Sequence, residues 1–286
     1  MTVDEPLDEP VDLPLDPRAH VNAYFRVERW EVPPADPEDG PSAMSGRAPL
    51  DDHLRSPAGG LRTGALNTVF DSLGGLMSGL AVQPGWIVTT SLMTTVARLS
   101  HTGPLRIDGR ILRRGRNAVV AALDAVDEGE GDRPVAAALL TSAVLDPGAM
   151  RLEFERPLVM PMPPPHGDRR PPEEFFCIQP GEGPVTRLDL EDRLRNPWGI
   201  LHGGALAVLA DEAACRAVRA DGSGRRQVAA PDSVLHYLQP ARRGPVEARA
   251  EVVGRRNGRA LVRIGIHDVG ADGRRIMLAS VSVTDV

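Results

Sequence analysis

Two long, mainly apolar stretches dominate the pattern of hydrophobic and polar positions along the chain. Residues 205–220 are good helix formers and apolar almost all round, which indicates a buried helix. Residues 65–81 predict a second helix, whose Gly74-Gly75 lowers its intrinsic stability, so packing must hold it. Each stretch carries one aspartate among apolar neighbours, Asp211 or Asp71. Because a buried carboxylate is costly unless it is paired or has a use, both aspartates need an explanation.

Around each helix, shorter segments have the composition and partial alternation of β-strands. In the first part these are residues 21–32, 86–99, 105–113, 118–126 and 135–145, and in the second 174–179, 228–238, 246–253, 260–267 and 276–283. Each half therefore reads as a strand, a long loop, a buried helix and a four-strand meander. Short turns that contain glycine make such a meander antiparallel. One sheet wrapped around one buried helix is an α+β domain.

The two parts are copies of one sequence. Residues 50–71 align without a gap on residues 190–211, with matches at Leu, Asp, Leu-Arg, Pro, Gly, Leu, Gly-Ala-Leu and the final Asp. After a slip of one residue the alignment continues through Gly103-Pro104 against Gly244-Pro245. An internal duplication of two copies is too short for a solenoid. It predicts two like domains that pack on each other as a pseudo-symmetric pair.

The domain boundaries follow from composition. Residues 1–19 are acidic and proline-rich, which predicts a disordered tail. Residues 20–146 form the first predicted domain and residues 173–286 the second. Between them, residues 147–172 contain a Pro-Met-Pro-Pro-Pro run and predict a proline-stiffened linker.

Composition excludes several classes of function. The 286 residues carry a net charge of −6, which argues against a general nucleic-acid binder. The chain has no lysine, so Schiff-base chemistry and a Walker-type phosphate loop are excluded. The two cysteines, Cys177 and Cys215, fit no metal spacing and suggest a reducing compartment. Since no apolar run is long enough for a membrane span and no secretory signal is visible, we expect a cytoplasmic protein that does not bind membranes.

The segment around the second helix carries the most specific motif. It reads Asn196-Pro-Trp-Gly-Ile-Leu-His202-Gly203-Gly204-Ala-Leu, with Asp211 nine positions after His202 and a later Tyr-Leu-Gln-Pro-Ala at residues 237–241. This pattern resembles the hotdog-fold acyl-CoA thioesterases of the phenylacetate-pathway (PaaI-like) type, and it covers nearly all of the second half. The first half keeps Gly64 and Asp71 but has Arg62-Thr63 in place of His-Gly. The resemblance implies an α+β protein of two tandem hotdog domains paired as an intramolecular pseudo-dimer.

The resemblance also implies an activity, namely hydrolysis of an acyl-CoA to the free acid and CoA. Coenzyme A would then be part of the substrate, and no other cofactor or metal is expected. The family arrangement implies sites shared across the hotdog interface. Because hotdog pairs often associate further, the resemblance also implies a homo-oligomer, with a dimer of double hotdogs as one plausible form.

Elementary geometry independently predicts a shared site. The free N–H groups at a helix N-terminus suit a developing oxyanion, and Gly203-Gly204 lets a substrate approach the backbone. An aspartate can serve as general base or nucleophile. Asp211 follows Gly203 by eight residues, about 12 Å along a helix at ~1.5 Å per residue. One thioester carbon cannot touch both, so the glycine end of one helix must work with the aspartate of the other.

This pairing makes the two sites unequal. Site one combines Asn196, His202 and Gly203 of the second half with Asp71 and Thr89 of the first. Site two combines Ser56, Arg62 and Thr63 of the first half with Asp211 and Ala230 of the second. Thr89 aligns with the hydroxyl residue that similar enzymes use to orient water, and Ala230 occupies that position in site two. Our hypothesis is one working site per chain, site one.

Each site residue has a role in this hypothesis and an ordinary structural alternative. The roles are Asp71 as base or nucleophile, the Gly203 N–H as oxyanion donor, Asn196 as positioner of carbonyl or water, Thr89 as water-holder, Gly204 as a substrate-contacting residue and His202 as a residue that shapes the start of the helix. The alternatives are an arginine partner for Asp71, a structural or relic Asp211, a loop cap for Asn196, and an ordinary β-branched strand residue for Thr89.

Two other functions compete with hydrolysis. The degraded first motif favours a non-catalytic hotdog that binds or senses acyl-CoA. A hotdog hydratase or dehydratase needs a histidine and an acidic partner at a different spacing, which we do not find. Paired arginines at 113–114, 225–226, 242–243 and 255–256 are candidate ligands for the CoA phosphates, and the sequence does not choose among them.

Overall fold

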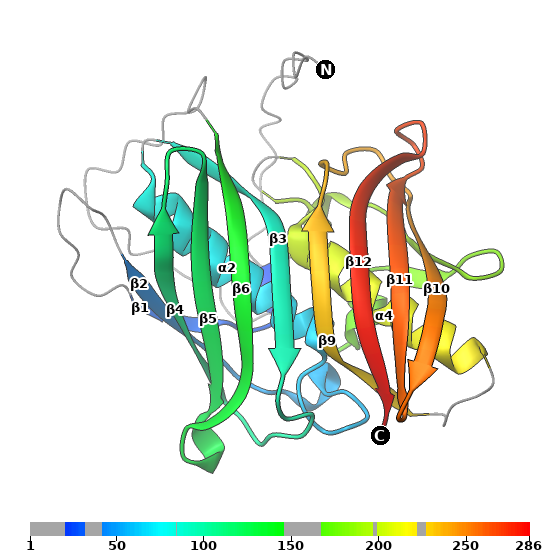
Figure 1. Ribbon diagram of the computed structural model, residues 1–286, viewed down its shortest axis with the longest axis horizontal. Helices are drawn as coiled ribbons and strands as arrows, with labels where there is room; N and C mark the ends of the chain where they lie inside the picture. The colour runs from blue at the N-terminus through cyan, green and yellow to red at the C-terminus, as the bar shows by residue number, and fades with distance from the viewer. Residues whose placement is uncertain (1–20, 32–41, 84, 146–166, 197–198, 222–226) are drawn as a thin grey trace.

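A computed structural model describes residues 21–31, 42–83, 85–145, 167–196, 199–221 and 227–286. Its two halves each wrap a sheet around one long helix, and the sheets join edge to edge (Figure 1). The first half contains α1 (Val21–Tyr24), β1 (Glu28–Glu31), β2 (Ala43–Ala48), η1 (Asp52–Leu54), α2 (Thr63–Ala81), β3 (Trp86–Val96), β4 (Leu105–Arg114), β5 (Ala118–Asp127), η2 (Glu128–Glu130) and β6 (Arg133–Leu145). The second half contains α3 (Pro172–Phe175), β7 (Ile178–Pro180), β8 (Val185–Leu188), η3 (Asp192–Leu194), α4 (Gly203–Ala220), β9 (Val228–Tyr237), β10 (Val246–Arg256), β11 (Arg259–Asp268) and β12 (Arg274–Asp285).

The strands form one antiparallel sheet of twelve in the order β1-β2-β4-β5-β6-β3-β9-β12-β11-β10-β8-β7. Both long helices and all eight long strands lie where the sequence predicts them. The predicted four-strand meander is wrong in one respect, because β3 lies beside β6 and not beside β4. The reason is the helix. As α2 crosses the face of the sheet, it carries the chain from β2 near one edge to β3 at the other.

The short elements differ most from expectation. The predicted strand at 21–32 is a helical turn followed by the brief β1, and the one at 174–179 is a helical turn followed by β7. In each case a left-handed residue ends the turn, Arg26 (φ 52°) or Cys177 (φ 55°). The stretches expected as loops also contain β2 and β8. The predicted tail at 1–19 and most of the predicted linker lie outside the described residues.

The register of the central strands locates a pseudo-twofold axis. Beyond the one-residue slip, position n of the first half corresponds to n+141 of the second, so Met93 corresponds to Val234. These two residues face each other in the β3–β9 ladder. The helices α2 and α4 pack against each other behind this ladder. The duplicated halves are therefore related by rotation about an axis through the Met93–Val234 pair.

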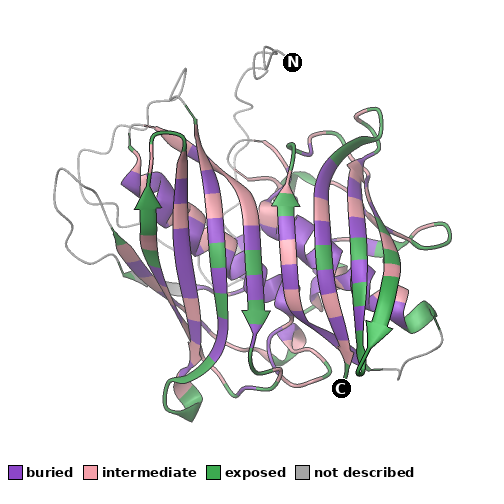
Figure 2. Ribbon diagram, viewed as in Figure 1, coloured by how far each residue is buried: buried purple, intermediate pink, exposed green. Residues whose placement is uncertain are grey.

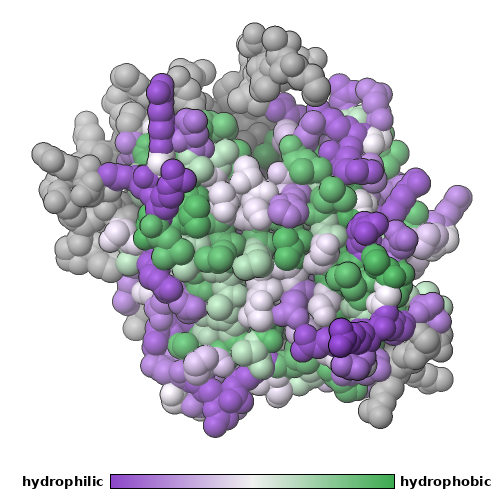
Figure 3. Space-filling model, in the orientation of Figure 1, coloured by the Kyte–Doolittle hydropathy of each residue, from purple (hydrophilic) through white to green (hydrophobic). Residues whose placement is uncertain are grey.

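Burial alternates along the long strands, with one face turned to the helices and the other outward (Figure 2). The helix-facing side chains and both helices form a continuous apolar core. The outward face keeps apolar residues as well, in a band across the middle of the sheet (Figure 3). Met93, Leu139 and Leu261 are each at least 40% exposed. Within the described chain, neither long helix is apolar enough to cross a lipid bilayer.

Candidate functional site

The duplicated motif folds into the same loop in both halves. Arg195 spans its loop by donating from Nη1 to the carbonyls of Gly199 (2.7 Å) and Arg242 (3.0 Å). Arg55 spans the equivalent loop, donating to the carbonyls of Gly59 and His101. Each arginine therefore ties its loop to the segment that follows the first long strand. Both halves thus tie the loop to the end of a strand in the same way, and this contact fixes the residue at which each helix begins.

Asp71 meets the N-terminus of the opposite helix, as the helix-rise estimate predicted. A methyl group added to Gly203 would lie only 2.7 Å from Oδ2 of Asp71. On the other side of the pseudo-twofold axis, a methyl on Gly64 would lie 2.9 Å from Cβ of Asp211. Because each glycine lacks a side chain, the facing aspartate can pack directly on the backbone of the first helical turn.

The Asp71 carboxyl is poised to change protonation near neutral pH. Burial raises its pKa to about 6, and a hydrogen bond from the Thr89 hydroxyl opposes that rise. Its Oδ1 is buried and accepts no hydrogen bond from the described residues. A buried acceptor without a partner costs free energy unless a ligand or water completes it. A pKa near the working pH is what general-base chemistry requires.

The start of α4 offers the complementary donor. His202 caps the helix through Nδ1, which accepts the Gly204 N–H at 3.0 Å. The N–H of Gly203 donates to none of the groups that the structure describes. It lies at the positive end of the helix dipole, where an oxyanion is favoured. His202 thus shapes the helix start as expected, and a part in proton transfer stays untested.

Tyr237 completes this side of the site, and the sequence analysis did not assign it a role. Its hydroxyl donates to the Gly203 carbonyl at 3.3 Å. Burial raises the Tyr237 pKa well above its usual value, and the Asp71 charge adds to the rise. The equivalent residue beside site two is Val96. The sequence signal for Tyr237 was the Tyr-Leu-Gln-Pro-Ala motif that contains it. In the structure, a hydrogen bond of 2.9 Å from the Leu201 N–H to the Ala241 carbonyl holds that segment against the helix start.

Two further predicted residues have structural contacts of their own. The Asn196 side chain accepts the Ile200 N–H at 3.4 Å, which closes its own loop. A methyl on Gly204 would lie 2.2 Å from Cγ2 of Thr68, so Gly204 also permits the close crossing of α2 and α4. The proposed contacts of Asn196 and Gly204 with substrate stay predictions.

Site two contains a different set of groups. Arg62 takes the place of His202 and forms ion pairs with Glu173 (3.5 Å) and Glu212 (3.8 Å). The Asp211 pKa is raised to about 6 by burial, while the Arg62 charge lowers it. Ala230 offers no hydroxyl, and its carbonyl accepts a hydrogen bond from the Thr63 side chain. The remaining cavity between these residues is about 10 Å³, near the minimum for one water molecule.

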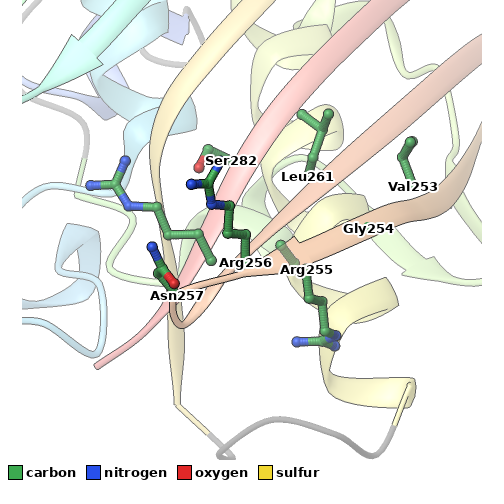
Figure 4. A pocket seen from close by; sticks show the side chains of 9 residues that line it. Val253, Gly254, Arg255, Arg256, Asn257, Leu261 and Ser282 are labelled. Atoms are coloured by element: carbon green, nitrogen blue, oxygen red, sulfur yellow. The ribbon is translucent and has the colours of Figure 1, made fainter.

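A larger hollow lies elsewhere, on the β10–β11 hairpin (Figure 4). It is open to solvent, has a volume of about 560 Å³ and is lined by Arg255, Arg256 and Arg259 among others. It contains neither aspartate. The described residues hold no cluster of three or more histidine, cysteine, aspartate or glutamate side chains suited to a metal ion.

Comparison with known proteins gives one family and one fold. Residues 199–272 match the family model described as the thioesterase superfamily. That range contains the start of α4, Asp211 and Tyr237. None of the curated proteins matches the chain.

Several solved structures share the whole architecture. The tesB protein of Mycobacterium avium subs paratuberculosis has a TM-score of 0.59 and 14% identity, covering 92% of this chain and 97% of its own. Acyl-CoA thioesterase II TesB2 of Mycobacterium marinum has a TM-score of 0.54 and 16% identity, covering 92% and 96%. The 12:0-ACP thioesterase of Umbellularia californica has a TM-score of 0.57 and 11% identity, covering 84% and 93%. At these identities the likeness is one of fold, and it confirms the predicted α+β architecture of two paired halves.

Proposed function

We propose that the chain hydrolyses acyl-CoA at site one, since residues 199–272 match the thioesterase superfamily model and the whole chain has the double-hotdog fold. One observation carries the proposal. Asp71 is a buried carboxyl with a pKa of about 6, and its Oδ1 accepts no hydrogen bond from the described residues. Its Oδ2 lies against the start of α4, where the Gly203 N–H has no acceptor among the described residues. A base or nucleophile and an oxyanion donor are thus held together from opposite halves.

The reaction uses these groups on opposite sides of the thioester carbon. The carbonyl oxygen accepts the Gly203 N–H, which is strongest when the oxygen becomes negative in the tetrahedral intermediate. In the general-base route, Asp71 takes a proton from water as the water oxygen bonds to the carbonyl carbon. The intermediate then collapses by breaking the C–S bond, and the proton held on Asp71 passes to the leaving sulfur.

A nucleophilic route uses the same geometry. The Asp71 carboxylate attacks the carbonyl carbon, the CoA thiolate leaves, and water hydrolyses the resulting anhydride. The Thr89 hydroxyl orients the water in either route. The Tyr237 hydroxyl donates to the Gly203 carbonyl, and this hydrogen bond keeps the first turn of α4 and the Gly203 N–H in place.

Site two lacks the features that carry the proposal. The carboxyl of Asp211 is compensated by the Arg62 charge and by a hydrogen bond from the Gly64 backbone. With alanine at the hydroxyl position, site two has no counterpart of the Thr89 hydroxyl to orient an attacking water.

Three proteins test the proposal, namely wild type, Asp71→Asn and Asp211→Asn, assayed by thioester hydrolysis over an acyl-CoA panel. We expect Asp71→Asn to lower kcat by about 10²- to 10⁴-fold, the usual contribution of a positioned base. Asp211→Asn is the matched control, since it makes the same change at the pseudo-equivalent position, and it should keep wild-type kcat. Loss of activity in Asp211→Asn alone would mean that the other site is the working one.

The degraded site two favours one alternative, a non-catalytic protein that binds acyl-CoA. Its arginine and its missing hydroxyl are what a binding pocket derived from an enzyme would contain. Wild-type protein that binds acyl-CoA but hydrolyses none of the panel would favour this alternative over hydrolysis.

A further inference from the structure

The loops beside the two helix N-termini differ in their charged side chains. The rim of site one consists of Arg242, Arg243 and Arg274, from the β9–β10 loop and the start of β12. The rim of site two occupies the equivalent place in the first half and carries Glu128, Glu130 and Asp132 in the β5–β6 connection. The two rims lie at opposite ends of the molecule, near the top right and bottom left of Figure 1.

The site-one rim is built onto the loop that precedes Gly203. The buried Asp268 accepts the backbone N–H groups of Arg242 (2.8 Å) and Arg243 (3.1 Å). The Arg274 guanidinium donates to the Pro240 carbonyl at 3.5 Å. Since the Ala241 carbonyl accepts the Leu201 N–H, this support is continuous with the start of α4. The backbone that carries the three arginines is therefore held in place relative to the candidate site.

None of the three side chains is neutralised by a carboxylate of the described chain. Many other arginines of the protein are paired; for example, Arg255 binds Asp221 at 2.9 Å and Arg259 binds Asp232 at 3.3 Å, both beside the hollow of Figure 4. The charge of Asp268 is already met by backbone donors. Asp272 is the one acidic side chain in the β11–β12 turn itself, and it forms no ion pair with these arginines within the described residues.

The duplication shows that folding does not require this charge. The positions equivalent to Arg242 and Arg243 are His101 and Thr102, and His101 is buried with Nε2 accepting the Leu61 N–H at 2.8 Å. The position equivalent to Arg274 is Arg133, which is paired with Glu130 at 2.8 Å. One backbone framework thus supports both rims, and none of the three equivalent positions in the first half holds an unpaired arginine.

We propose that Arg242, Arg243 and Arg274 bind the phosphate groups of coenzyme A when its thioester lies in site one. This inference rests on the proposed function, and it specifies coenzyme A as the carrier of the acyl group. Guanidinium groups bind phosphate through paired, charge-assisted hydrogen bonds. CoA carries its phosphates at the far end of the pantetheine arm from the sulfur. The three carboxylates of the site-two rim are each paired with an arginine, so these ion pairs leave no free guanidinium there for the same phosphates.

The test compares acyl-CoA with the same acyl group on pantetheine, which lacks the nucleotide phosphates. We expect Arg243→Gln combined with Arg274→Gln to raise KM for acyl-CoA about tenfold or more, with kcat kept, and to leave acyl-pantetheine unchanged. Added salt should raise the wild-type KM for acyl-CoA alone. The control, Arg116→Gln combined with Arg263→Gln, removes equal charge at two exposed positions outside both rims and should behave as wild type.

Three results would overturn the proposal. They are equal wild-type KM values for the two substrates, an equal rise in KM in the control variant, and a KM effect confined to an acyl carrier protein thioester, which would assign the rim to a protein surface. Failure of the proposed hydrolysis can be distinguished from failure of the rim proposal. Calorimetric titration with coenzyme A itself measures binding at the rim without turnover. If no acyl-CoA is hydrolysed, binding of CoA that the double substitution weakens still supports the rim, and CoA binding that it leaves unchanged rejects it.

Discussion

Two opposing contributions set the proton affinity of Asp71. Burial among apolar neighbours favours the neutral acid, and the Thr89 hydrogen bond favours the carboxylate. The balance leaves a pKa of about 6, above that of an ordinary aspartate. Since a base must be ionised to accept a proton, the carboxylate is available at neutral pH and still holds its proton more tightly than an exposed aspartate would.

The pH–rate profile should report this balance. In wild type we expect kcat to fall as pH drops through about 6, because protonated Asp71 cannot act as base. Thr89→Val keeps the size of the side chain and removes the hydroxyl that lowers the pKa, so the acidic limb should move to higher pH and the maximal rate should fall. Thr90→Val is a matched control from the same strand, since the Thr90 hydroxyl donates to the Thr141 carbonyl. An acidic limb that stays in place in Thr89→Val would show that Thr89 does not contact the reacting carboxyl.

At the residue scale, sequence reasoning identified the Asp71–Gly203 contact because helix rise alone forbids the alternative pairing. It missed Tyr237, whose contact with Gly203 depends on how the end of β9 meets the loop before α4. It also missed the ion pair of Arg62 with Glu173. That partner belongs to a short helical turn that the strand-like composition of its segment concealed.

The two long helices cross at glycine. A methyl on Gly204 would approach Thr68 side-chain atoms at 2.2 to 2.8 Å, and one on Gly64 would approach the Val208 backbone at 2.8 Å. Removing Cβ from these positions brings the helix backbones together, which brings each aspartate to the opposite N-terminus. The catalytic geometry that we propose is therefore a consequence of helix packing.

Substituting glycines of the two helices should give opposite results. Gly204→Ala must displace Thr68 or separate the helices, and we expect it to lower the free energy of unfolding by about 1–3 kcal/mol and to reduce kcat. Gly75→Ala is the matched control, since its methyl would meet only Cδ1 of Ile87 at 3.9 Å. It should stabilise the protein by up to about 1 kcal/mol through helix propensity. Thermal or urea unfolding measures both; equal effects would show that the crossing does not depend on Gly204.

Among the elements, length decided what the sequence could predict. The eight long strands and both long helices each have enough residues for a clear period and clear turn signals. Four-residue elements such as α1 and β8 have too few positions for a period, and their conformation depends on tertiary contacts. Tyr24 in α1, for example, stacks on Phe175 in α3 at 3.8 Å between ring centroids. The position of β3 beside β6 could not be predicted from the sequence either, because it depends on the path of α2 across the sheet.

For the whole molecule, the outer face of the sheet is unusually apolar (Figure 3). Met93 on β3 faces Leu139 on β6 in the ladder, and both are about 40% exposed. Exposed apolar residues that adjoin one another are typical of interfaces. The face is centred near the pseudo-twofold axis, so it is suited to a symmetric contact with a second copy. We propose a dimer of double hotdogs that forms through this face.

Light scattering on the purified protein tests the dimer. We expect a mass near twice the 30.7 kDa of one chain, and a shift to the monomer mass in Met93→Glu combined with Leu139→Glu, because each buried carboxylate would lack a partner. Leu112→Glu, at an equally exposed apolar position towards the end of β4, is the control and should leave the mass unchanged. A monomeric wild-type protein would reject the proposed interface.

The β3–β9 ladder, where Met93 faces Val234, has a consequence for how the protein can change over evolutionary time. In a dimer of identical chains, one mutation alters both copies of a position at once, so any gain at one site is imposed on the other. Here the two copies are encoded separately. Tyr237 can persist beside one aspartate while Val96 occupies the same place beside the other. Because of the covalent duplication, the copy of each position at the second site no longer has to serve the reaction. Those positions can therefore acquire a different task.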